Sequence, residues 1–404
     1  MAYGARRSLC RGADLTATVA EARTPASTAE VREQVRDAAA RGRRLRIAGG
    51  GTWLDANRPV RAGATLVMRS LSGIVEYEPG DLTLTARAGT TMDEIARATA
   101  AHGQWLALDP FGDPSRATLG ATIATASSGP LARAFGAPRD VTLGVEFVTG
   151  RGDVARGGGR VVKNVAGFDL TRLLTGSWGS LGVVTEVTVR LRALPAVECT
   201  LAFDVGQTTQ DVEDVRLALH RLPFLPFAAT LLDASLARRL SVSERAATML
   251  VRFGGNDDAV RAQREQLRAL GDVRDIDADV WRRLQTTEVA RAAVLRLSRL
   301  PSRFAATWLD ATHIAEQWPD GYCHGDPGRG VARLVLPLGD EDASSRLESV
   351  LGVSYDGTRI FERLPAALWP SLAPPAVRGR IERGLKTAFD PHNVLNPGIF
   401  GETP

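Results

Sequence analysis

Three stretches rich in glycine and hydroxyl side chains give this chain its clearest chemical signal. The first follows a short expected strand, Leu45–Ala48, and consists of Gly49, Gly50, Gly51 and Thr52. Consecutive glycines leave backbone N–H groups exposed, and the Thr52 hydroxyl adds a donor, so such a loop can surround a phosphate oxygen. On these four residues alone, an ordinary turn explains the sequence equally well.

The second stretch, residues 109–129, combines small residues, hydroxyls and glycines with almost no charge. It contains Asp109-Pro110-Phe111-Gly112-Asp113-Pro114, Thr118-Leu119-Gly120-Ala121 and Ala124-Thr125-Ala126-Ser127-Ser128-Gly129. Such a segment can pack flat against a planar ligand while its hydroxyl and N–H groups reach the edge of the ligand. A buried loop packed against a neighbouring element is the equally good alternative.

The third stretch leads into an expected strand that runs from Val183 to Arg192. It carries Lys163 and Asn164, followed by glycines at positions 167, 176, 179 and 182. In the strand the odd positions are apolar or threonine and, apart from Val184, the even positions are polar. This alternation predicts a half-buried strand with one solvated face. We interpret Lys163 as a partner for a phosphate or a carboxylate, with a surface salt bridge as the alternative.

Two common nucleotide-binding motifs are excluded. A Rossmann fingerprint needs the glycine loop to open a helix, with an acidic residue about 20 positions further on. Here the glycine triplet is followed by residues without a helical period that end at Pro59. No GxxxxGK[ST] sequence is present, which excludes a P-loop. Three glycine-rich loops within about one domain length still favour a nucleotide cofactor held mainly by backbone groups.

Length and composition narrow the class of protein. The 404 residues allow roughly two or three domains. No apolar run approaches the roughly 18 residues of a transmembrane helix, and the N-terminus has no apolar signal region, so a cytoplasmic location is expected. A net charge of +4, without a basic run interleaved with aromatics, argues against nucleic-acid binding. Cys10, Cys199 and Cys323 lie far apart, so no disulfide, zinc or iron–sulfur site is expected from this chain alone.

The elements that must position these loops are of both types. Ser27-Thr28-Ala29-Glu30 and Thr91-Met92-Asp93-Glu94 predict capping boxes for helices that end near Gly42 and Gly103. Strands are expected at Thr65–Met68, Ile74–Glu78, Leu82–Ala88 and Val141–Thr149. This mixture predicts an α+β arrangement rather than regular βαβ repeats.

From about residue 196 to 375 the pattern changes to alternating strands and helices. Strands are expected at Cys199–Val205, Phe227–Leu232, Met249–Phe253 and Arg333–Leu338, and helices at Asp211–Leu222, Asp257–Leu270 and Asp342–Leu351. Within Tyr322-Cys323-His324-Gly325-Asp326, His324 reads as a turn residue rather than a metal ligand. Arg333 could bind a carboxylate. Of the 50 basic residues only Lys163 and Lys386 are lysine, however, and among 48 arginines no single one stands out.

In this order, the loops resemble the FAD-binding domain of the vanillyl-alcohol-oxidase (PCMH-type) flavoprotein superfamily. The resemblance rests on GGGT, AGTTMDEI, DP…TLGA…ATASSG, FDLTRLLTGSWGSLGVVTEVTVRL and the closing FDPHNVLNPGIF, and covers about residues 25–195 and 380–400. It implies an α+β fold with a PCMH-type FAD-binding domain of two α+β subdomains (residues 1–195). A smaller α+β cap domain (196–375) and a C-terminal segment returning to the FAD domain (376–404) would follow. Val377, Ile381 and Leu385 mark one face of a helix in that last segment, stopped by Pro391 and Pro397.

The resemblance also implies a set of residues for non-covalently bound FAD. Gly49, Gly50, Gly51 and Thr52 would take the pyrophosphate. The flavin and ribityl region would be flanked by Pro110, Thr118, Gly120 and Ala121, with Ser128 and Gly129. Gly182 and Val184 would offer backbone contacts at the nucleotide end, and Asn396 would lie near the isoalloxazine.

Three features of the sequence depart from the pattern of the superfamily. Many relatives have a second glycine where Ala121 stands and an asparagine where Ala126 stands. Some relatives attach FAD through a histidine, but the nearest histidine here, His102, falls outside the motif, so non-covalent FAD is expected. Related 2-hydroxy-acid dehydrogenases bind a metal through clustered histidines in the cap, whereas this chain offers only His324 there. The sequence therefore predicts no metal site and leaves the catalytic residues unassigned.

Within the superfamily, KNVAGFDLTRLLTGSWGSLG is most similar to the E-subunit family of bacterial glycolate oxidases. That similarity implies a hetero-oligomeric complex with a D-type flavin subunit and an iron–sulfur F-type subunit. Such a complex oxidises glycolate to glyoxylate and passes electrons to a membrane acceptor. The chain would then be cytoplasmic, or peripheral at the inner membrane through its partners. Two alternatives stay open: a stand-alone FAD-dependent oxidoreductase for another 2-hydroxy acid or alcohol, and a non-catalytic structural subunit with a degenerate flavin fold.

Overall fold

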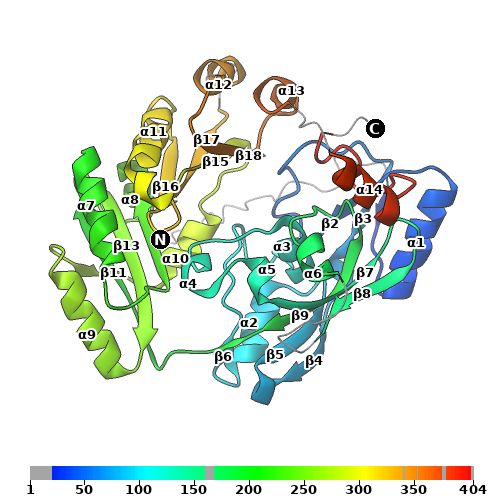
Figure 1. Ribbon diagram of the computed structural model, residues 1–404, viewed down its shortest axis with the longest axis horizontal. Helices are drawn as coiled ribbons and strands as arrows, with labels where there is room; N and C mark the ends of the chain where they lie inside the picture. The colour runs from blue at the N-terminus through cyan, green and yellow to red at the C-terminus, as the bar shows by residue number, and fades with distance from the viewer. Residues whose placement is uncertain (1–20, 160–167, 340–341, 353, 375–378, 402–404) are drawn as a thin grey trace, which may run out of the picture.

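The computed structural model describes residues 21–159, 168–339, 342–352, 354–374 and 379–401. Within these ranges the elements before residue 195 and the last helix gather on one side of the molecule (Figure 1). The elements between residues 197 and 372 form the other side. Lys163, Asn164, Gly167 and Val377, which the sequence singled out, lie outside the described residues.

The first side contains two main sheets. A parallel three-stranded sheet has the order β1-β3-β2, and an antiparallel five-stranded sheet has the order β4-β5-β9-β7-β8. A short pair, β10-β6, lies apart from both. The strands are β1 (Ala22–Arg23), β2 (Leu45–Ala48), β3 (Ala64–Val67), β4 (Ile74–Glu78), β5 (Thr83–Arg87), β6 (Gln104–Trp105), β7 (Thr142–Val148), β8 (Val154–Gly158), β9 (Val183–Arg190) and β10 (Arg192–Ala193).

Each of these sheets has its own helices and its own core. Helix α1 buries Val31, Val35 and Ala38 against the three-stranded sheet. Leu119, Ile123 and other apolar residues from α2, α3 and α6 pack on the five-stranded sheet. The helices of this side are α1 (Thr28–Ala40), α2 (Met92–Ala100), α3 (Leu119–Thr125), α4 (Ala132–Phe135), α5 (Pro138–Val141), α6 (Leu170–Leu174) and α14 (Arg380–Phe389).

The second side is one antiparallel eight-stranded sheet with the order β14-β11-β13-β12-β16-β17-β15-β18. Alternating side chains supply two apolar faces: Leu201 and Phe203 pack under α7, α9, α11 and α12, while Ala202 and Leu250 pack under α8 and α10. The elements are β11 (Val197–Val205), α7 (Thr209–His220), β12 (Ala228–Leu232), α8 (Ala234–Arg239), β13 (Ala247–Gly255), α9 (Asp257–Arg268), β14 (Arg274–Asp275), α10 (Asp279–Thr286), β15 (Ala292–Ser298), α11 (Phe304–Glu316), β16 (Tyr322–Asp326), β17 (Val331–Pro337), α12 (Ala343–Leu351), β18 (Thr358–Arg363) and α13 (Trp369–Leu372).

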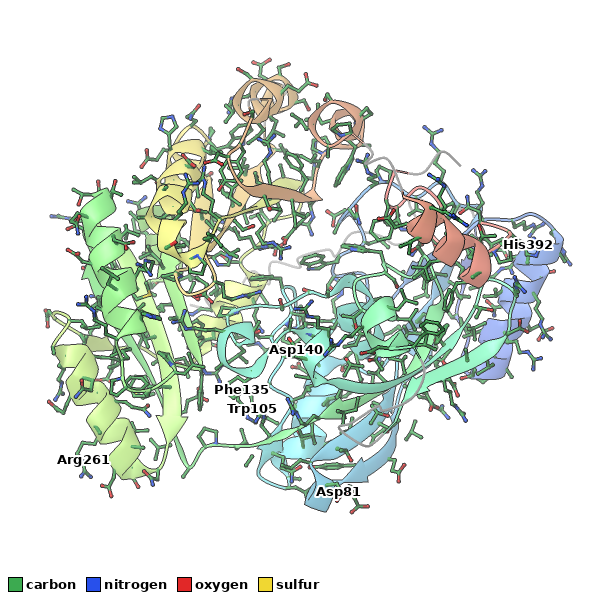
Figure 2. All side chains as sticks on the ribbon, in the orientation of Figure 1. Asp81, Trp105, Phe135, Asp140, Arg261 and His392 are labelled. Carbon is green, nitrogen blue, oxygen red and sulfur yellow. The ribbon has the colours of Figure 1, made fainter. Side chains whose placement is uncertain are left out.

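The two sides meet through an aromatic cluster and a buried ion pair. Trp105 and Phe135 lie together at this junction (Figure 2), with ring centroids 5.3 Å apart, and Phe227 of the second side packs 5.0 Å from Phe135. Nearby, the Arg133 guanidinium donates to Asp326 at 2.7 Å, and both side chains are about nine-tenths buried. The loop that contains α4 therefore fixes the end of β16 relative to the first side.

Most local predictions are confirmed. Thr91 and Glu94 form the expected reciprocal capping box of α2. At α1 the Ser27 hydroxyl accepts from the Glu30 N–H, but the Glu30 carboxylate accepts from the Ala26 N–H instead of completing the box. Strand β9 buries its odd positions and leaves the side chains of Glu186 and its even neighbours half-buried.

Two interpretations from the sequence are wrong. His324 does not lie in a turn: it is buried in β16, an interior strand that pairs with both β12 and β17. Short strands rich in Gly and Asp are easily mistaken for turns, because propensity does not register sheet-interior burial. The last helix forms, but the apolar face expected around Ile381 and Leu385 is not a packed face, since α14 buries no side chain fully and Ile381 is 78% exposed.

After α14 the chain returns to the first side. Leu395 forms a parallel bridge with Leu45, and the Asn396 N–H donates to the Leu45 carbonyl at 2.9 Å. Strands β11–β18 pair only among themselves within the described residues. The division at residues 195 and 375 remains a prediction, with which this pairing agrees. In the described ranges no helix is both long and apolar enough to cross a bilayer.

Ala126 ends helix α3 in an unusual backbone conformation. Its φ of 53° and ψ of 31° lie in the left-handed region, where a β-carbon costs roughly 1–2 kcal/mol. We expect Ala126→Asn and Ala126→Gly each to raise the free energy of unfolding by about 0.5–1 kcal/mol in urea titrations. Ala96→Gly, in the exposed middle of α2, serves as the control and should lower it by a similar amount. A loss of stability at position 126 would contradict this account of the helix end.

Candidate active site

A long central cleft runs between the two sheets of the first side. Its empty volume is about 950 Å³ counted to the open mouth, and it is lined mostly by small and apolar residues. A pocket of this size and character is typical of a cofactor site. The walls come from the loop after β2, the stretch from Pro110 to Ser127 around α3, the loop before β9, and the C-terminal segment.

Most of the residues predicted from the sequence line this one cleft, although they come from four separate segments. These are Gly49, Gly51, Thr52, Pro110, Thr118, Gly120, Ala121, Gly182, Val184 and Asn396. Gly50, Ser128 and Gly129 do not line it. The last two instead line a second pocket, described below, which begins where the cleft ends.

The three consecutive glycines have different roles. Gly51 adopts φ +76°, which other residues rarely do. A β-carbon on Gly49 would lie 2.4 Å from the Thr118 hydroxyl oxygen and 2.8 Å from the Ala121 β-carbon, so the loop packs tightly on α3. A β-carbon on Gly50 would meet the Arg116 carbonyl, which explains a glycine there through packing rather than through access to the cleft.

The cleft presents unsatisfied polar groups that fit a dinucleotide. The buried hydroxyls of Thr118 and Ser127 have no hydrogen-bond partner. Buried polar atoms normally find partners, so these two await a ligand. Arg46 also lines the cleft, and burial lowers the pKa of its guanidinium. The Arg46 guanidinium donates to the Leu54 carbonyl, and the Asp55 charge acts on it without forming an ion pair, so a phosphate anion could still bind it.

Two tryptophans stand in the same cleft. The rings of Trp53 and Trp178 lie 6.1 Å apart with a 35° tilt, and Trp178 adopts φ +53°. The Trp53 indole N–H donates to the Phe111 carbonyl at 3.1 Å. These flat side chains can pack against a planar ring system, and their fluorescence reports on what enters the cleft.

The second pocket, here called the arginine pocket, lies at the junction with the eight-stranded sheet. Its empty volume is about 470 Å³, and it shares Phe111 with the cleft. The loop after α3 contributes Ser128, Gly129 and Pro130, and the turn between β16 and β17 contributes Arg329. The strands of the sheet contribute Thr230, Arg296, His324, Gly325, Asp326, Val331, Arg333 and Glu362. Three arginines on so small a pocket suit an anionic ligand.

A polar row crosses the sheet beneath this pocket. His324, Arg333 and Arg296 are direct cross-strand neighbours on β16, β17 and β15, so their side chains share one face. Arg333 is 4% exposed and is held by Glu288 at 2.7 Å and Glu362 at 2.6 Å, with its guanidinium 4.0 Å from the centre of the Phe111 ring. Burial alone would lower the pKa of Arg333, but the two carboxylates outweigh burial and raise it.

The other two arginines of the pocket form weaker ion pairs or none. Arg296 approaches Glu362 only at 3.8 Å, and Arg329 is exposed. Within the described part of the chain the Arg329 side chain enters no hydrogen bond or ion pair. His324 lies beside both Phe111 and Arg333, and its burial together with the Arg333 charge lowers its pKa to about 3. At neutral pH the imidazole is therefore uncharged.

Asp109 holds the loop that joins the cleft to the arginine pocket. Its carboxylate accepts from the Gly129 N–H at 3.1 Å and the Leu131 N–H at 3.0 Å. Gly129 has no room for a side chain, because a β-carbon would lie 2.5 Å from the Asp109 carbonyl oxygen. Burial raises the pKa of Asp109 to about 7, although both N–H groups and the Arg252 charge act against this rise.

This pKa makes stability depend on pH. Because Asp109 holds its proton more tightly when folded, its contribution is fully present below about pH 4 and is lost as pH rises to about 7. A rise from 3.8 to about 7 corresponds to roughly 4 kcal/mol. We therefore expect the free energy of unfolding of Asp109→Asn to fall less between pH 5 and pH 8, by about 2.5 kcal/mol, than that of the wild type. Urea titrations across this range measure the difference.

Other buried groups act equally in both proteins and cancel in that comparison. Asp233, with a pKa raised by burial to about 6, contributes in the same direction as Asp109. His324, with its lowered pKa, contributes in the opposite direction below about pH 6.5. If the free energy of unfolding changed equally with pH in the wild type and in Asp109→Asn, the prediction that the Asp109 carboxyl titrates near neutral pH would be wrong.

Comparison with known proteins agrees with this geometry. The family model described as an FAD binding domain matches residues 20–158. Glycolate oxidase subunit GlcE of Escherichia coli (strain K12) is 32% identical over 370 residues, which cover 91% of this chain and 95% of the relative. The chain belongs to this family of FAD-linked oxidoreductases. Glycolate oxidase subunit GlcD of Bacillus subtilis (strain 168) is 28% identical, covering 84% of this chain and 80% of the relative.

The solved structures confirm the fold expected from the sequence. A structure of p-cresol methylhydroxylase with substrate bound superposes with a TM-score of 0.70 at 15% identity, covering 94% of this chain and 88% of the other. The chain therefore has the PCMH-type α+β fold, and its cofactor is FAD. The assignment of individual cofactor-binding residues remains a prediction, supported by their position around one cleft.

Sequence reasoning missed several residues of both pockets. Arg46, Trp53 and Trp178 line the central cleft, and Arg296 and Arg329 line the arginine pocket. Arg296 and Arg333 did carry a signal, since each is the single charge in an otherwise apolar strand, AAVLRLS and VARLVLP. A charge in such a strand is buried only where it has partners or a function. Arg46 carried the same signal, as the single charge in the strand LRIA, whereas Arg329 carried none.

Proposed function

We propose that this chain binds FAD non-covalently and takes part in the oxidation of a small 2-hydroxy acid, with glycolate as the expected substrate and glyoxylate as product. The observation that carries the proposal is the arginine pocket, which adjoins the cleft and shares Phe111 with it. A ligand held there lies next to whatever fills the cleft. When bound, FAD supplies the acceptor for the hydride equivalent that leaves the α-carbon.

The three arginines of the arginine pocket have different roles in binding the substrate. Arg333 already pairs with two buried carboxylates, and moving it would break the shortest ion pairs of Glu288 and Glu362. The remaining ion pairs of these carboxylates are longer, 3.4 Å from Glu288 to Arg363 and 3.8 Å from Glu362 to Arg296. Arg329 and Arg296 are the arginines with capacity for another anion, so they would bind the substrate carboxylate.

His324 is the group suited to the substrate hydroxyl. Its neutral imidazole offers one nitrogen as acceptor and one N–H as donor. A pKa of about 3 makes it a weak base, so His324 orients the hydroxyl more effectively than it removes its proton. Within the described residues no group of three His, Cys, Asp or Glu side chains could hold a metal ion.

The expected partners are a D-type flavin subunit and an iron–sulfur F-type subunit. The names of the two relatives, both subunits of glycolate oxidases, support a complex. The weak base in this chain is also consistent with sharing the substrate chemistry with a second flavin subunit. Attachment of FAD through a side chain is not expected, because the described residues that line the central cleft include no histidine or cysteine.

The test is the visible spectrum of the purified chain after incubation with FAD. Flavin bands that move into the supernatant on acid precipitation would support non-covalent FAD, whereas flavin in the pellet would overturn that part. Anaerobic addition of glycolate, first to the chain and then to the chain with its partner subunits, should bleach the bands. Bleaching by neither would refute glycolate as substrate. Absence of flavin at saturating FAD would favour the structural-subunit alternative.

A further inference from the structure

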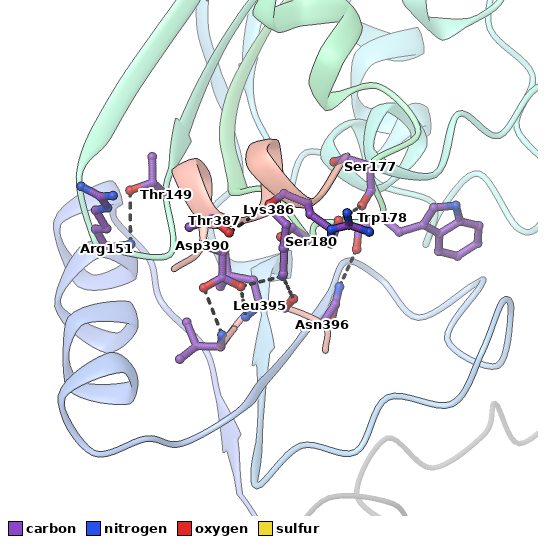
Figure 3. Close-up of polar contacts among 12 residues, drawn as sticks. Thr149, Arg151, Ser177, Trp178, Ser180, Lys386, Thr387, Asp390, Leu395 and Asn396 are labelled. Carbon is purple, nitrogen blue, oxygen red and sulfur yellow. Dashed lines mark hydrogen bonds and ion pairs between the residues drawn. The ribbon is translucent and has the colours of Figure 1, made fainter. Parts of the chain in front are cut away.

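A buried lysine ties the C-terminal segment to the wall of the central cleft (Figure 3). The Lys386 ammonium, on α14, donates to the Asp390 carboxylate at 2.7 Å, the Ser180 carbonyl at 2.9 Å and the Leu395 carbonyl at 3.2 Å. Its three N–H groups are therefore all used. The side chain is 13% exposed, although α14 otherwise lies at the surface.

Asp390, the ion-pair partner of Lys386, anchors the other side of this cluster of Lys386, Asp390, Ser180 and Leu395. Its side chain is fully buried and accepts from the Val394 N–H at 3.0 Å and the Leu395 N–H at 2.9 Å. A β-carbon on Gly150 would lie 2.2 Å from one of its oxygens, so the carboxylate packs directly against the Gly150 backbone. Lys386 and Asp390 thus fix the backbone immediately before Asn396.

Asn396 connects this cluster to residues that line the cleft. Its side-chain amide donates to the Trp178 carbonyl at 2.6 Å and its carbonyl oxygen accepts from the Ile47 N–H at 2.8 Å. Trp178, Ile47 and Asn396 all line the cleft. Lys386 reaches the same loop from its other end, through Ser180. Lys386 and Asp390 therefore determine the positions of two walls of the cleft, although neither residue lines the cleft.

We propose that Lys386 is a positioning residue for FAD: its ammonium joins Ser180, Asp390 and Leu395 and so holds Trp178 and Asn396 in place for the cofactor. An arginine cannot replace it, because a planar guanidinium cannot point three donors at three acceptors around one point. This explains a lysine at this position in a chain whose other basic residues are, with one exception, arginine. The proposal concerns affinity for FAD and is independent of the substrate.

The experiment measures FAD affinity of the full chain by quenching of tryptophan fluorescence, because Trp53 and Trp178 line the cleft. Titrations are made at a temperature where far-UV circular dichroism shows wild type and variants to be folded. We expect Lys386→Met to raise the Kd for FAD at least tenfold. Lys386→Arg, which keeps the charge and the bond to Asp390, should fold even if Lys386→Met does not, and should raise the Kd at least threefold.

Two controls separate positioning from general stability. Arg261→Met removes an exposed cation on α9, on the far side of the eight-stranded sheet (Figure 2), and should leave the Kd unchanged. Leu347→Ala opens a cavity in the core under α12 and should lower Tm without changing the Kd. If Lys386→Arg binds FAD like the wild type, or if Lys386→Met only lowers Tm as Leu347→Ala does, the proposal is overturned.

Discussion

Replacing Arg329 by methionine is expected to weaken binding of a small carboxylate in the arginine pocket by about 10- to 100-fold. A hydrogen bond to a charged group is worth about 1.5–3 kcal/mol, and 1.4 kcal/mol corresponds to a factor of ten. Methionine keeps most of the side-chain length and removes the charge. Arg329 is exposed and pairs with no carboxylate in the described part of the chain, so its loss should leave folding intact.

Oxalate is the appropriate probe for this prediction, because it has a carboxylate but no hydrogen on carbon and so binds without reacting. Its Kd is measured from the change that it causes in the flavin spectrum of the FAD-loaded chain, and glycolate is then compared in the bleaching assay. Arg261→Met supplies the control for loss of an exposed positive charge. An unchanged Kd in Arg329→Met would remove this arginine from the substrate site.

Arg333→Met should lower the stability of the protein more than its affinity for the ligand, in contrast to Arg329→Met. It would remove the nearest ion-pair partner of the buried Glu288 and Glu362, and breaking a buried ion pair costs about 3–5 kcal/mol. We therefore expect its main effect on Tm, whereas that of Arg329→Met falls on ligand affinity. The contrast distinguishes the arginine that builds the pocket from the arginine that receives the ligand.

Gly49→Val should abolish FAD binding at micromolar concentrations, with a loss of at least 100-fold. The first added carbon would lie 2.4 Å from the Thr118 hydroxyl and 2.8 Å from the Ala121 β-carbon, and two further methyl groups would follow. Both neighbours line the cleft, so relief of the clash must change the shape of the cleft. Flavin content after dialysis and the fluorescence titration both measure this loss.

Gly63→Val is the matched control for the glycine loop. Gly63 lies just before β3, its φ is not in the left-handed region, and no atom stands within 4 Å of a β-carbon built there. We expect this variant to bind FAD like the wild type. Equal retention of flavin in Gly49→Val and Gly63→Val would show that the loop after β2 does not approach the cofactor.

The cofactor side of the molecule was largely predictable because its signals are local. Capping residues at Thr91, alternation in β9 and glycines beside small hydroxylated residues each report on the few residues around them. Their combination in one order predicted the FAD fold and the four segments that surround the cleft. Local patterns could not reveal that Gly50 faces Arg116 instead of the cleft, since this depends on a contact across 66 positions.

The arginine pocket was not predictable, for a physical reason. His324, Arg333 and Arg296 become neighbours only through the strand order β16-β17-β15, which differs from their order in the chain. Arg296 and His324 are 28 positions apart in the sequence, and nothing in either segment indicates that the two are neighbours. Glu288 and Glu362 determine which arginine is held in an internal ion pair, and their positions depend on the same non-local strand pairing.

The return of the C-terminal segment has a consequence for how the protein is made. Ile47 and Asn396, which share a hydrogen bond at the cleft, are 349 positions apart. At about 5–20 residues per second, a ribosome needs roughly 20–70 s to travel that distance. The nascent first side waits through that interval with Lys386 and Asn396 not yet synthesised. The flavin site is therefore completed late in synthesis, and a nascent chain stalled between β11 and β18 would expose a site that lacks the wall formed by Asn396.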